Sequence, residues 1–167
     1  MRKFIYLFLA LLFPTLIFIS LKYEGRNEFN IPVLYENGVE AGKGCGYNYA
    51  KPYVVPDSIL RTRDVSLYPA SVFVFRNDAF LVSGILDELR PEFSVDEVIF
   101  TDVKTIESDS TRYHVLKNCV LLSSKPNEMV LLDRKGRIRG YYELESRKER
   151  DRLRVELKIL LQAAHEN

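Results

Sequence analysis

The sequence has 167 residues, with 24 Lys and Arg against 23 Asp and Glu, two Cys, no Trp and 47% hydrophobic residues. This length and composition predict at most one globular domain of modest size. A net charge of +1 excludes the basic footprint of a nucleic-acid-binding protein, and so much apolar material excludes a disordered chain. Seven Pro and eight Gly are too few for a low-complexity or collagen-like protein.

An uncharged apolar segment occupies residues 4–21. As a helix, these residues would extend about 27 Å, close to the roughly 30 Å hydrocarbon layer of a bilayer. Arg2 and Lys3 precede the segment and balanced charges follow it, so the positive-inside rule places the N-terminus in the cytoplasm. We therefore expect residues 1–21 to be a single-pass anchor in the cell inner membrane. The rest of the chain would then be periplasmic or otherwise extracytoplasmic.

A cleaved signal peptide would share the basic start and the apolar run. The run is, however, longer than the usual apolar region of about 7–15 residues. The residues at its end, Phe18-Ile19-Ser20-Leu21-Lys22, contain no small-x-small cleavage site. The sequence therefore favours an uncleaved anchor.

Residues 22–66 are rich in turn-forming and aromatic residues and show no regular periodicity, which predicts a lead-in of loops and short extended pieces. Three tyrosines in this segment, Tyr47, Tyr49 and Tyr53, have two interpretations. They could form an exposed patch for contact with another protein, or they could pack on a sheet. The valines that follow Tyr53 favour packing of these tyrosines on a sheet.

Regular elements are predicted throughout residues 67–167. Residues 71–75 form a short β-branched and aromatic run, typical of a strand buried on both faces. Asn77 or Asp78 can cap a helix that ends before Pro91, and residues 95–101 then form a second strand. A strand, a helix and a strand within this length predict a βαβ unit with two parallel strands.

The last third of the chain predicts a short helix at residues 110–118 and then a hairpin. Strands at 129–132 and 137–143 are joined by a tight turn that ends at Gly136. A capping box at Ser146-Arg147-Lys148-Glu149 begins a terminal helix, and its charged residues up to Arg154 are interpreted as a solvated face. The apolar stripe of this helix is Leu153, Leu157, Leu160, Leu161 and Ala164. The order β-α-β, then β-β-α, predicts an α/β fold of the thioredoxin-like type.

The hairpin and terminal helix resemble the Sco family, membrane-anchored thioredoxin-like proteins that handle copper and thiols in cytochrome c oxidase assembly. The resemblance is carried by residues 129–161, which include the run Leu131-Leu132-Asp133-Arg134-Lys135-Gly136 and the pair Gly140-Tyr141. It extends more loosely over residues 70–165. It implies an outward-facing domain behind a single N-terminal anchor, with a respiratory-chain or assembly protein as partner.

The chain departs from the family at the residues that carry its chemistry. The family has a Cys-x-x-x-Cys directly after the first strand, where this sequence reads Arg76-Asn77-Asp78-Ala79-Phe80. The family's histidine ligand would fall near Lys125-Pro126-Asn127, and none of these residues is a histidine. Without two thiolates and an imidazole there is no soft-ligand set for copper. We therefore expect no metal, no cofactor and no catalytic residue at these positions.

Two cysteines and one histidine, Cys45, Cys119 and His114, are the available soft ligands elsewhere. Their spacing leaves three alternatives open: a metal or redox site of all three residues, a disulfide between the cysteines, or two separate thiols with Cys119 buried. The sequence thus predicts a non-catalytic binding or assembly protein. The alternative is a thiol-disulfide or copper-handling protein that uses Cys45 and Cys119.

Overall fold

The computed structural model describes residues 12–20, 31–40, 45, 49–62, 67–76, 79–103 and 109–165, without the side chains of 62 and 79–82. The chain divides into two compact units, Met1–Asn30 and Ile31–Asn167. The second unit therefore includes much of the predicted lead-in together with the predicted domain.

The predicted membrane span is described only in part. Residues 12–20 are helical, whereas residues 4–11 and 21 lie outside the described residues. No helix within the described ranges has both the length and the apolar character needed to cross a bilayer.

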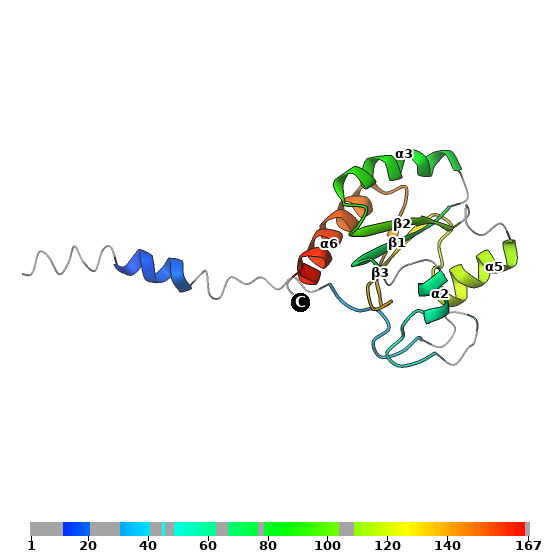
Figure 1. Cartoon of the computed structure of the whole chain (residues 1–167), viewed down its shortest axis with the longest axis horizontal. Helices are drawn as coiled ribbons and strands as arrows, with labels where there is room; N and C mark the ends of the chain where they lie inside the picture. Colours follow the sequence, from blue (N-terminus) through cyan, green and yellow to red (C-terminus); the bar gives the residue numbers. More distant parts are fainter. Residues whose placement is uncertain are drawn as a thin grey trace, which may run out of the picture. The chain divides into compact units, whose positions relative to one another are not determined.

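The second unit contains all the predicted strands and helices and two further elements, α2 and η2 (Figure 1). In chain order the elements are α2 (Asp57–Thr62), β1 (Ala70–Phe75), α3 (Ala79–Leu89), η2 (Arg90–Glu92), β2 (Val98–Asp102), α5 (Ser110–His114), η3 (Val115–Val120), β3 (Glu128–Asp133), β4 (Ile138–Glu143) and α6 (Arg147–His165). Helix α2 lies in the segment that was predicted to hold only loops and extended pieces. Its six residues are too few for a periodic pattern to be recognised.

The four strands form one mixed sheet in the order β2-β1-β3-β4. Strand β1 is parallel to β2 and antiparallel to β3, and β3 is antiparallel to β4. The predicted βαβ unit and hairpin therefore join in a single sheet. All residues of β1 and β3 are buried, as expected of the two central strands. The α/β class is confirmed.

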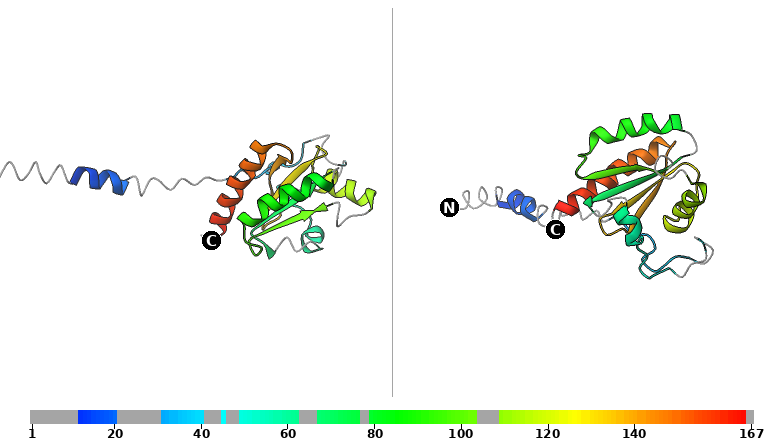
Figure 2. Two further views of the ribbon diagram at one scale, coloured as in Figure 1. Left: turned by 90° about the horizontal axis from the view of Figure 1, so that it is seen from above. Right: turned by 45° about the vertical axis from the view of Figure 1, so that its right-hand side comes forward.

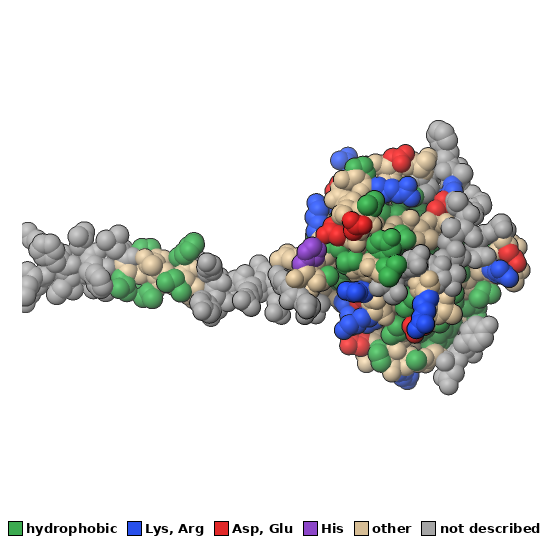
Figure 3. Space-filling view, in the orientation of Figure 1, with side chains coloured by type: hydrophobic (Ala, Val, Ile, Leu, Met, Phe, Trp, Pro, Cys, Tyr) green, Lys and Arg blue, Asp and Glu red, His purple; other side chains and the backbone are tan. Residues whose placement is uncertain are grey.

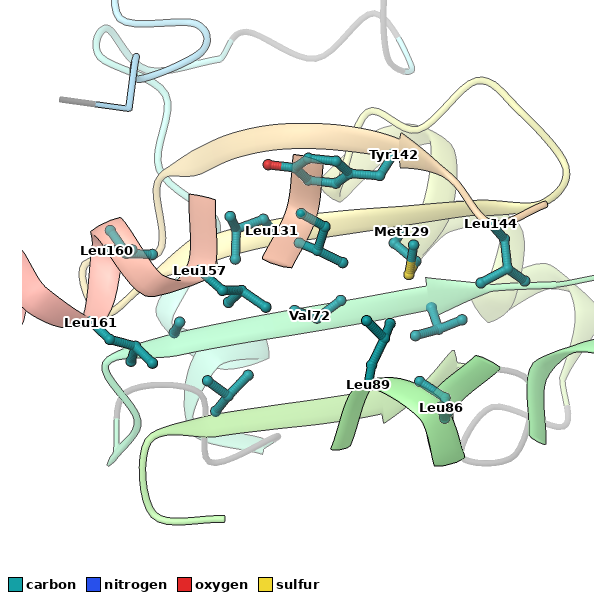
Figure 4. Packing of buried hydrophobic residues seen from close by; sticks show 14 of the residues in the cluster. Val72, Leu86, Leu89, Met129, Leu131, Tyr142, Leu144, Leu157, Leu160 and Leu161 are labelled. Atoms are coloured by element: carbon teal, nitrogen blue, oxygen red, sulfur yellow. The ribbon is translucent and has the colours of Figure 1, made fainter. Parts of the chain in front are cut away.

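Alternate residues of the central strands point into two separate hydrophobic cores. Val72 and Val74 face a core built with α3 and α6, whereas Phe73 and Phe75 face one built with α2 and η3. Figure 4 shows Leu157, Leu160 and Leu161 of α6 and Leu86 and Leu89 of α3 directed at the strands. Helices thus cover both faces of the sheet, which is also visible in Figure 2.

Helix α6 differs from its prediction at both ends. Ala164 is exposed and does not belong to the buried stripe. The Glu149 N–H donates to Ser146 Oγ (3.4 Å), as in a capping box, but the Ser146 N–H donates to the Glu143 carbonyl. The Glu149 side chain pairs with Arg152 instead (2.8 Å).

The charged face of α6 is only partly solvated. The Arg154 side chain is 16% exposed and lies 2.5 Å from Glu88 of α3 and 2.7 Å from Glu92 of η2. Part of the charge run therefore connects the two helices that cover the same core.

Strand β2 and the helix after it also have bounds that differ from the predicted ones, each for a local reason. Strand β2 begins at Val98 because Ser94 starts a turn, in which its carbonyl accepts from the N–H of Val98 (3.1 Å). The helix predicted at 110–118 continues to Val120 because α5 widens into the π-helical segment η3. Asp109 caps its start by accepting from the N–H of Thr111.

The β3–β4 turn requires glycine at residue 136. Gly136 has a φ of +73°, and a Cβ there would lie 2.6 Å from Leu60 Cδ1. Its carbonyl also accepts from the N–H of Val55 (2.9 Å), so the turn packs closely against the segment around α2. Gly84, in α3, is exposed, and a Cβ there would meet nothing within 4 Å.

Alanine at these two glycines should change stability in opposite directions. Gly136→Ala should lower the free energy of unfolding by about 1–3 kcal/mol, because it adds backbone strain and a clash with Leu60. Gly84→Ala is the matched control and should raise it by about 0.5–1 kcal/mol, because alanine is the better helix former. Urea unfolding measures both, and equal effects of the two substitutions would contradict the description of the turn.

Candidate functional site

Cys45 and Cys119 are joined in a disulfide, with their Cα atoms 5.0 Å apart. Cys45 is exposed, whereas Cys119 lies in η3 and is 6% exposed. Of the three alternatives that the sequence left open, the structure contains the disulfide. It fastens the segment before α2 to the segment that follows β2.

His114 does not complete a metal site with the cysteines. It is exposed at the end of α5, with its ring 5.7 Å from the ring of Tyr113. The described residues hold no group of three or more His, Cys, Asp and Glu side chains placed to bind a metal ion.

Four tyrosines, Tyr35, Tyr49, Tyr53 and Tyr141, form a continuous chain of edge-to-face contacts that we call the tyrosine cluster. The ring centroids are 5.2 Å apart for Tyr49 and Tyr53, and 6.4 Å apart for both Tyr35–Tyr53 and Tyr35–Tyr141. Three of these residues come from the lead-in and the fourth from β4. The lead-in therefore packs against the sheet through aromatic rings whose geometry is favourable.

Three hydroxyls of the tyrosine cluster donate to three successive carbonyls at the end of η3. Tyr49 donates to Cys119 (2.9 Å), Tyr53 to Val120 (2.6 Å) and Tyr141 to Leu121 (2.9 Å). Carbonyls at the end of a helix have no partner within it, so these hydroxyls replace the missing donors. Burial raises the pKa of the Tyr53 and Tyr141 hydroxyls, which favours the protonated form that can donate.

The sequence predicted part of the tyrosine cluster. The prediction that the lead-in tyrosines pack on the sheet is confirmed for Tyr49 and Tyr53, which contact the sheet and η3. Tyr47 lies outside the described residues. Tyr35 and Tyr141 were missed. Tyr141 stands on a strand with a recognised alternation, but its partners are 106 and 20 positions away in the sequence, and no local pattern links them.

An ion pair occupies the carboxyl end of β1, the place where the sequence was expected to lack a thiol site. Arg76 lies 2.5 Å from Asp102 at the end of β2, and these side chains are only 12% and 16% exposed. Asn77 and Asp78 lie outside the described residues. At residues 125–127, where the sequence has no histidine, Lys125 pairs with Glu143, and Asn127 Nδ2 donates to Glu145 (2.7 Å).

A groove of about 820 Å³ lies beside the outer strand β4 and the tyrosine cluster. Its lining comes from Tyr35, from residues 118–128, from β4 and from the start of α6. Glu128 is 4% exposed and accepts from the Ser123 hydroxyl (2.7 Å). Burial lowers the pKa of nearby Lys117, and Glu128 opposes this shift.

The rim of the groove carries charges that are already paired. Lys125 pairs with Glu143, and Arg152 pairs with Glu149 and donates to the Tyr141 carbonyl (2.7 Å). Basic and acidic side chains are similarly interspersed on the face of the second unit in Figure 3. Paired charges around polar and aromatic walls suit the binding of a largely uncharged ligand.

Removal of one cluster hydroxyl should destabilise the second unit. Tyr53→Phe should lower the free energy of unfolding by about 1–3 kcal/mol, because the partly buried Val120 carbonyl loses its donor. Tyr68→Phe, at a half-buried tyrosine outside the tyrosine cluster, should change it by less than about 0.5 kcal/mol. Chemical denaturation of the two variants tests the difference, and similar values for both would show that the hydroxyl is dispensable.

The disulfide should stabilise the fold and leave no reactive thiol. Replacing both cysteines (Cys45→Ser with Cys119→Ser) should lower the free energy of unfolding by about 2–4 kcal/mol, because the bond closes a long loop. The unmodified protein should show no titratable thiol until it is reduced. A full complement of free thiols in protein purified without reductant would contradict the pairing.

Comparison of the chain with protein-family models, curated proteins and solved structures found no significant match.

Proposed function

We propose that the chain is a membrane-anchored, outward-facing thioredoxin-like protein that binds a partner and has no redox or copper chemistry of its own. We further propose that this partner takes part in the assembly of a respiratory oxidase. The groove beside β4 is the proposed place of binding.

The arrangement of the sheet supports the thioredoxin-like assignment. Strands β2 and β1 are parallel, and β1 is followed in the sheet by the antiparallel hairpin β3–β4. Helices α3 and α6 contribute to one core, and η3 to the core on the other face. This is the layout that the order of elements predicted from the sequence.

The observation that carries the non-catalytic part is the Arg76–Asp102 ion pair at the ends of β1 and β2. A thiol site at this place needs cysteines at the start of the following helix, where the helix dipole would favour the thiolate. Residues 76–80 contain no cysteine. The guanidinium and the carboxylate at this place bind each other, and neither is a thiolate or a soft metal ligand.

The disulfide supports the proposed location. Disulfides persist in oxidising compartments such as the periplasm and are rare in the cytosol. The only two cysteines of the chain form one. An extracytoplasmic position for Ile31–Asn167 agrees with the charge pattern around residues 4–21.

The respiratory partner rests on the resemblance of residues 129–161 to the Sco family. In that family the hairpin and the last helix belong to proteins that act in cytochrome c oxidase assembly. A relative that retained the fold and the anchor but lost the ligands would act by binding alone.

The second candidate function is thiol-disulfide exchange by Cys45 and Cys119. It is favoured by one observation, the exposure of Cys45, which leaves a sulfur of the disulfide accessible to an attacking thiolate. The buried environment of Cys119 and the tyrosine hydroxyl on its carbonyl favour a structural role instead.

Two measurements on the full chain test the proposal. The purified protein, before and after reduction, should neither catalyse disulfide reduction in insulin nor hold Cu(I) stoichiometrically. Cells that lack the chain should lose active respiratory oxidase from their membranes, and both the wild type and the double cysteine variant should restore it in proportion to their abundance. Stoichiometric copper on both cysteines would contradict the non-catalytic part, and unchanged oxidase would contradict the partner.

A further inference from the structure

Strand β4 forms one edge of the sheet, and its main-chain groups alternate between β3 and the outside. The Leu144 N–H points inward, because it donates to the Asn127 carbonyl (3.2 Å). The main-chain N–H and carbonyl of the neighbouring Glu143 must then point away from β3. The main-chain groups of Tyr141 point away from β3 as well, and its carbonyl accepts from Arg152 (2.7 Å).

At Tyr141 and Glu143 the outward carbonyls accept hydrogen bonds, whereas no described residue accepts from the outward N–H groups. The Tyr141 carbonyl accepts from Arg152, and the Glu143 carbonyl accepts from the Ser146 N–H (3.3 Å). Within the described residues, the N–H groups of Tyr141 and Glu143 have no acceptor on that side. The open part of β4 therefore offers only hydrogen-bond donors, and a ligand that binds there must provide hydrogen-bond acceptors.

The first part of the same edge is already contacted by residues 31–34 of the lead-in. The Leu34 N–H donates to the Ile138 carbonyl (2.8 Å), and Arg139 donates to the Ile31 carbonyl (2.5 Å). This segment leaves the edge at a turn, where the Gly38 N–H donates to the Tyr35 carbonyl (3.0 Å). Of the described residues after Tyr35, none in this segment is hydrogen-bonded to β4.

The groove of about 820 Å³ follows this open part of the edge. Tyr35, Leu122 and Tyr141 provide aromatic and apolar surface, and the start of α6 forms the other side. The carboxylates of Glu143 and Glu149 also line the groove and are already paired with Lys125 and Arg152. A row of neutral carbonyls meets the open N–H groups without disturbing these pairs.

We propose that the groove binds an extended polypeptide segment of the partner, which adds to the sheet as a strand beside β4. Two carbonyls of that segment accept from the N–H groups of Tyr141 and Glu143, and its groove-facing side chains are uncharged and pack on Tyr35 and Leu122. This is strand addition at a sheet edge, in which main-chain hydrogen bonds provide affinity and the groove provides selectivity. The inference rests on the proposed function, because it names how the partner is held.

A random decapeptide library displayed on phage is first selected for binding to the full chain in detergent. The selected sequences are then synthesised and used as free peptides. Amide hydrogen exchange is then measured by NMR. In the free protein, the Tyr141 and Glu143 amides should exchange much faster than the Tyr142 amide, which points at β3. Bound peptide should slow exchange at Tyr141 and Glu143 specifically.

Two substitutions of one residue separate the main chain from the side chain. Glu143→Pro removes an outward N–H while the β3–β4 ladder remains, because proline is tolerated at such edge positions. It should weaken peptide binding by roughly tenfold or more. Glu143→Gln retains the N–H and removes the charge, so its affinity should stay within about threefold of wild type. Protection of the Met129 amide checks that each variant is folded.

Several results would overturn the proposal: no peptide selected over several rounds, selected peptides that protect other amides, or equal binding by the proline and glutamine variants. If Glu143→Pro does not fold, the exchange measurement on the wild type decides alone. Loss of oxidase in cells that lack the chain, with unaffected function of Glu143→Pro, would reject strand addition and leave the proposed function standing.

Discussion

Three hydrogen bonds from tyrosine hydroxyls to the carbonyls of residues 119, 120 and 121 connect the lead-in and β4 to the end of η3. The segment η3 ends in the interior, where a carbonyl without a donor would cost about 1–3 kcal/mol. Two of the donors come from the lead-in and one from β4. The disulfide adds a covalent connection at the same place. Lead-in, η3 and sheet are therefore held together at one point.

This connection also shapes the surface where we place function. Tyr35 and Tyr141 belong both to the tyrosine cluster and to the lining of the groove. The lead-in contacts the first part of the β4 edge and turns at Tyr35, and no described part of it is hydrogen-bonded to the rest of the edge, which lies beside the groove. At the ends of β1 and β2, in contrast, the side chains of Arg76 and Asp102 are paired with each other and only 12% and 16% exposed. The groove, and not this strand end, is therefore where we propose that a partner binds.

Most of the sheet could be predicted from the sequence because its signals are local. The alternating and buried runs at 71–75, 129–132 and 137–143, together with the turn at Gly136, correspond to β1, β3 and β4. The tyrosine cluster and the groove could not be predicted completely, because their parts are brought together by the fold from positions up to about a hundred residues apart. The pairing of Cys45 with Cys119 was one of three alternatives for the same reason, since spacing does not determine proximity.

Native-state hydrogen exchange tests the central claim, that the lead-in is an integral part of the fold, most directly. The amides of Tyr53 and Val55 donate to the carbonyls of Tyr35 and Gly136. With the disulfide intact, their protection should approach that of Met129 in β3, because all three would open only by global unfolding. Exchange of the two lead-in amides that is faster than that of Met129 by several orders of magnitude would show that the lead-in opens by itself and would contradict this account.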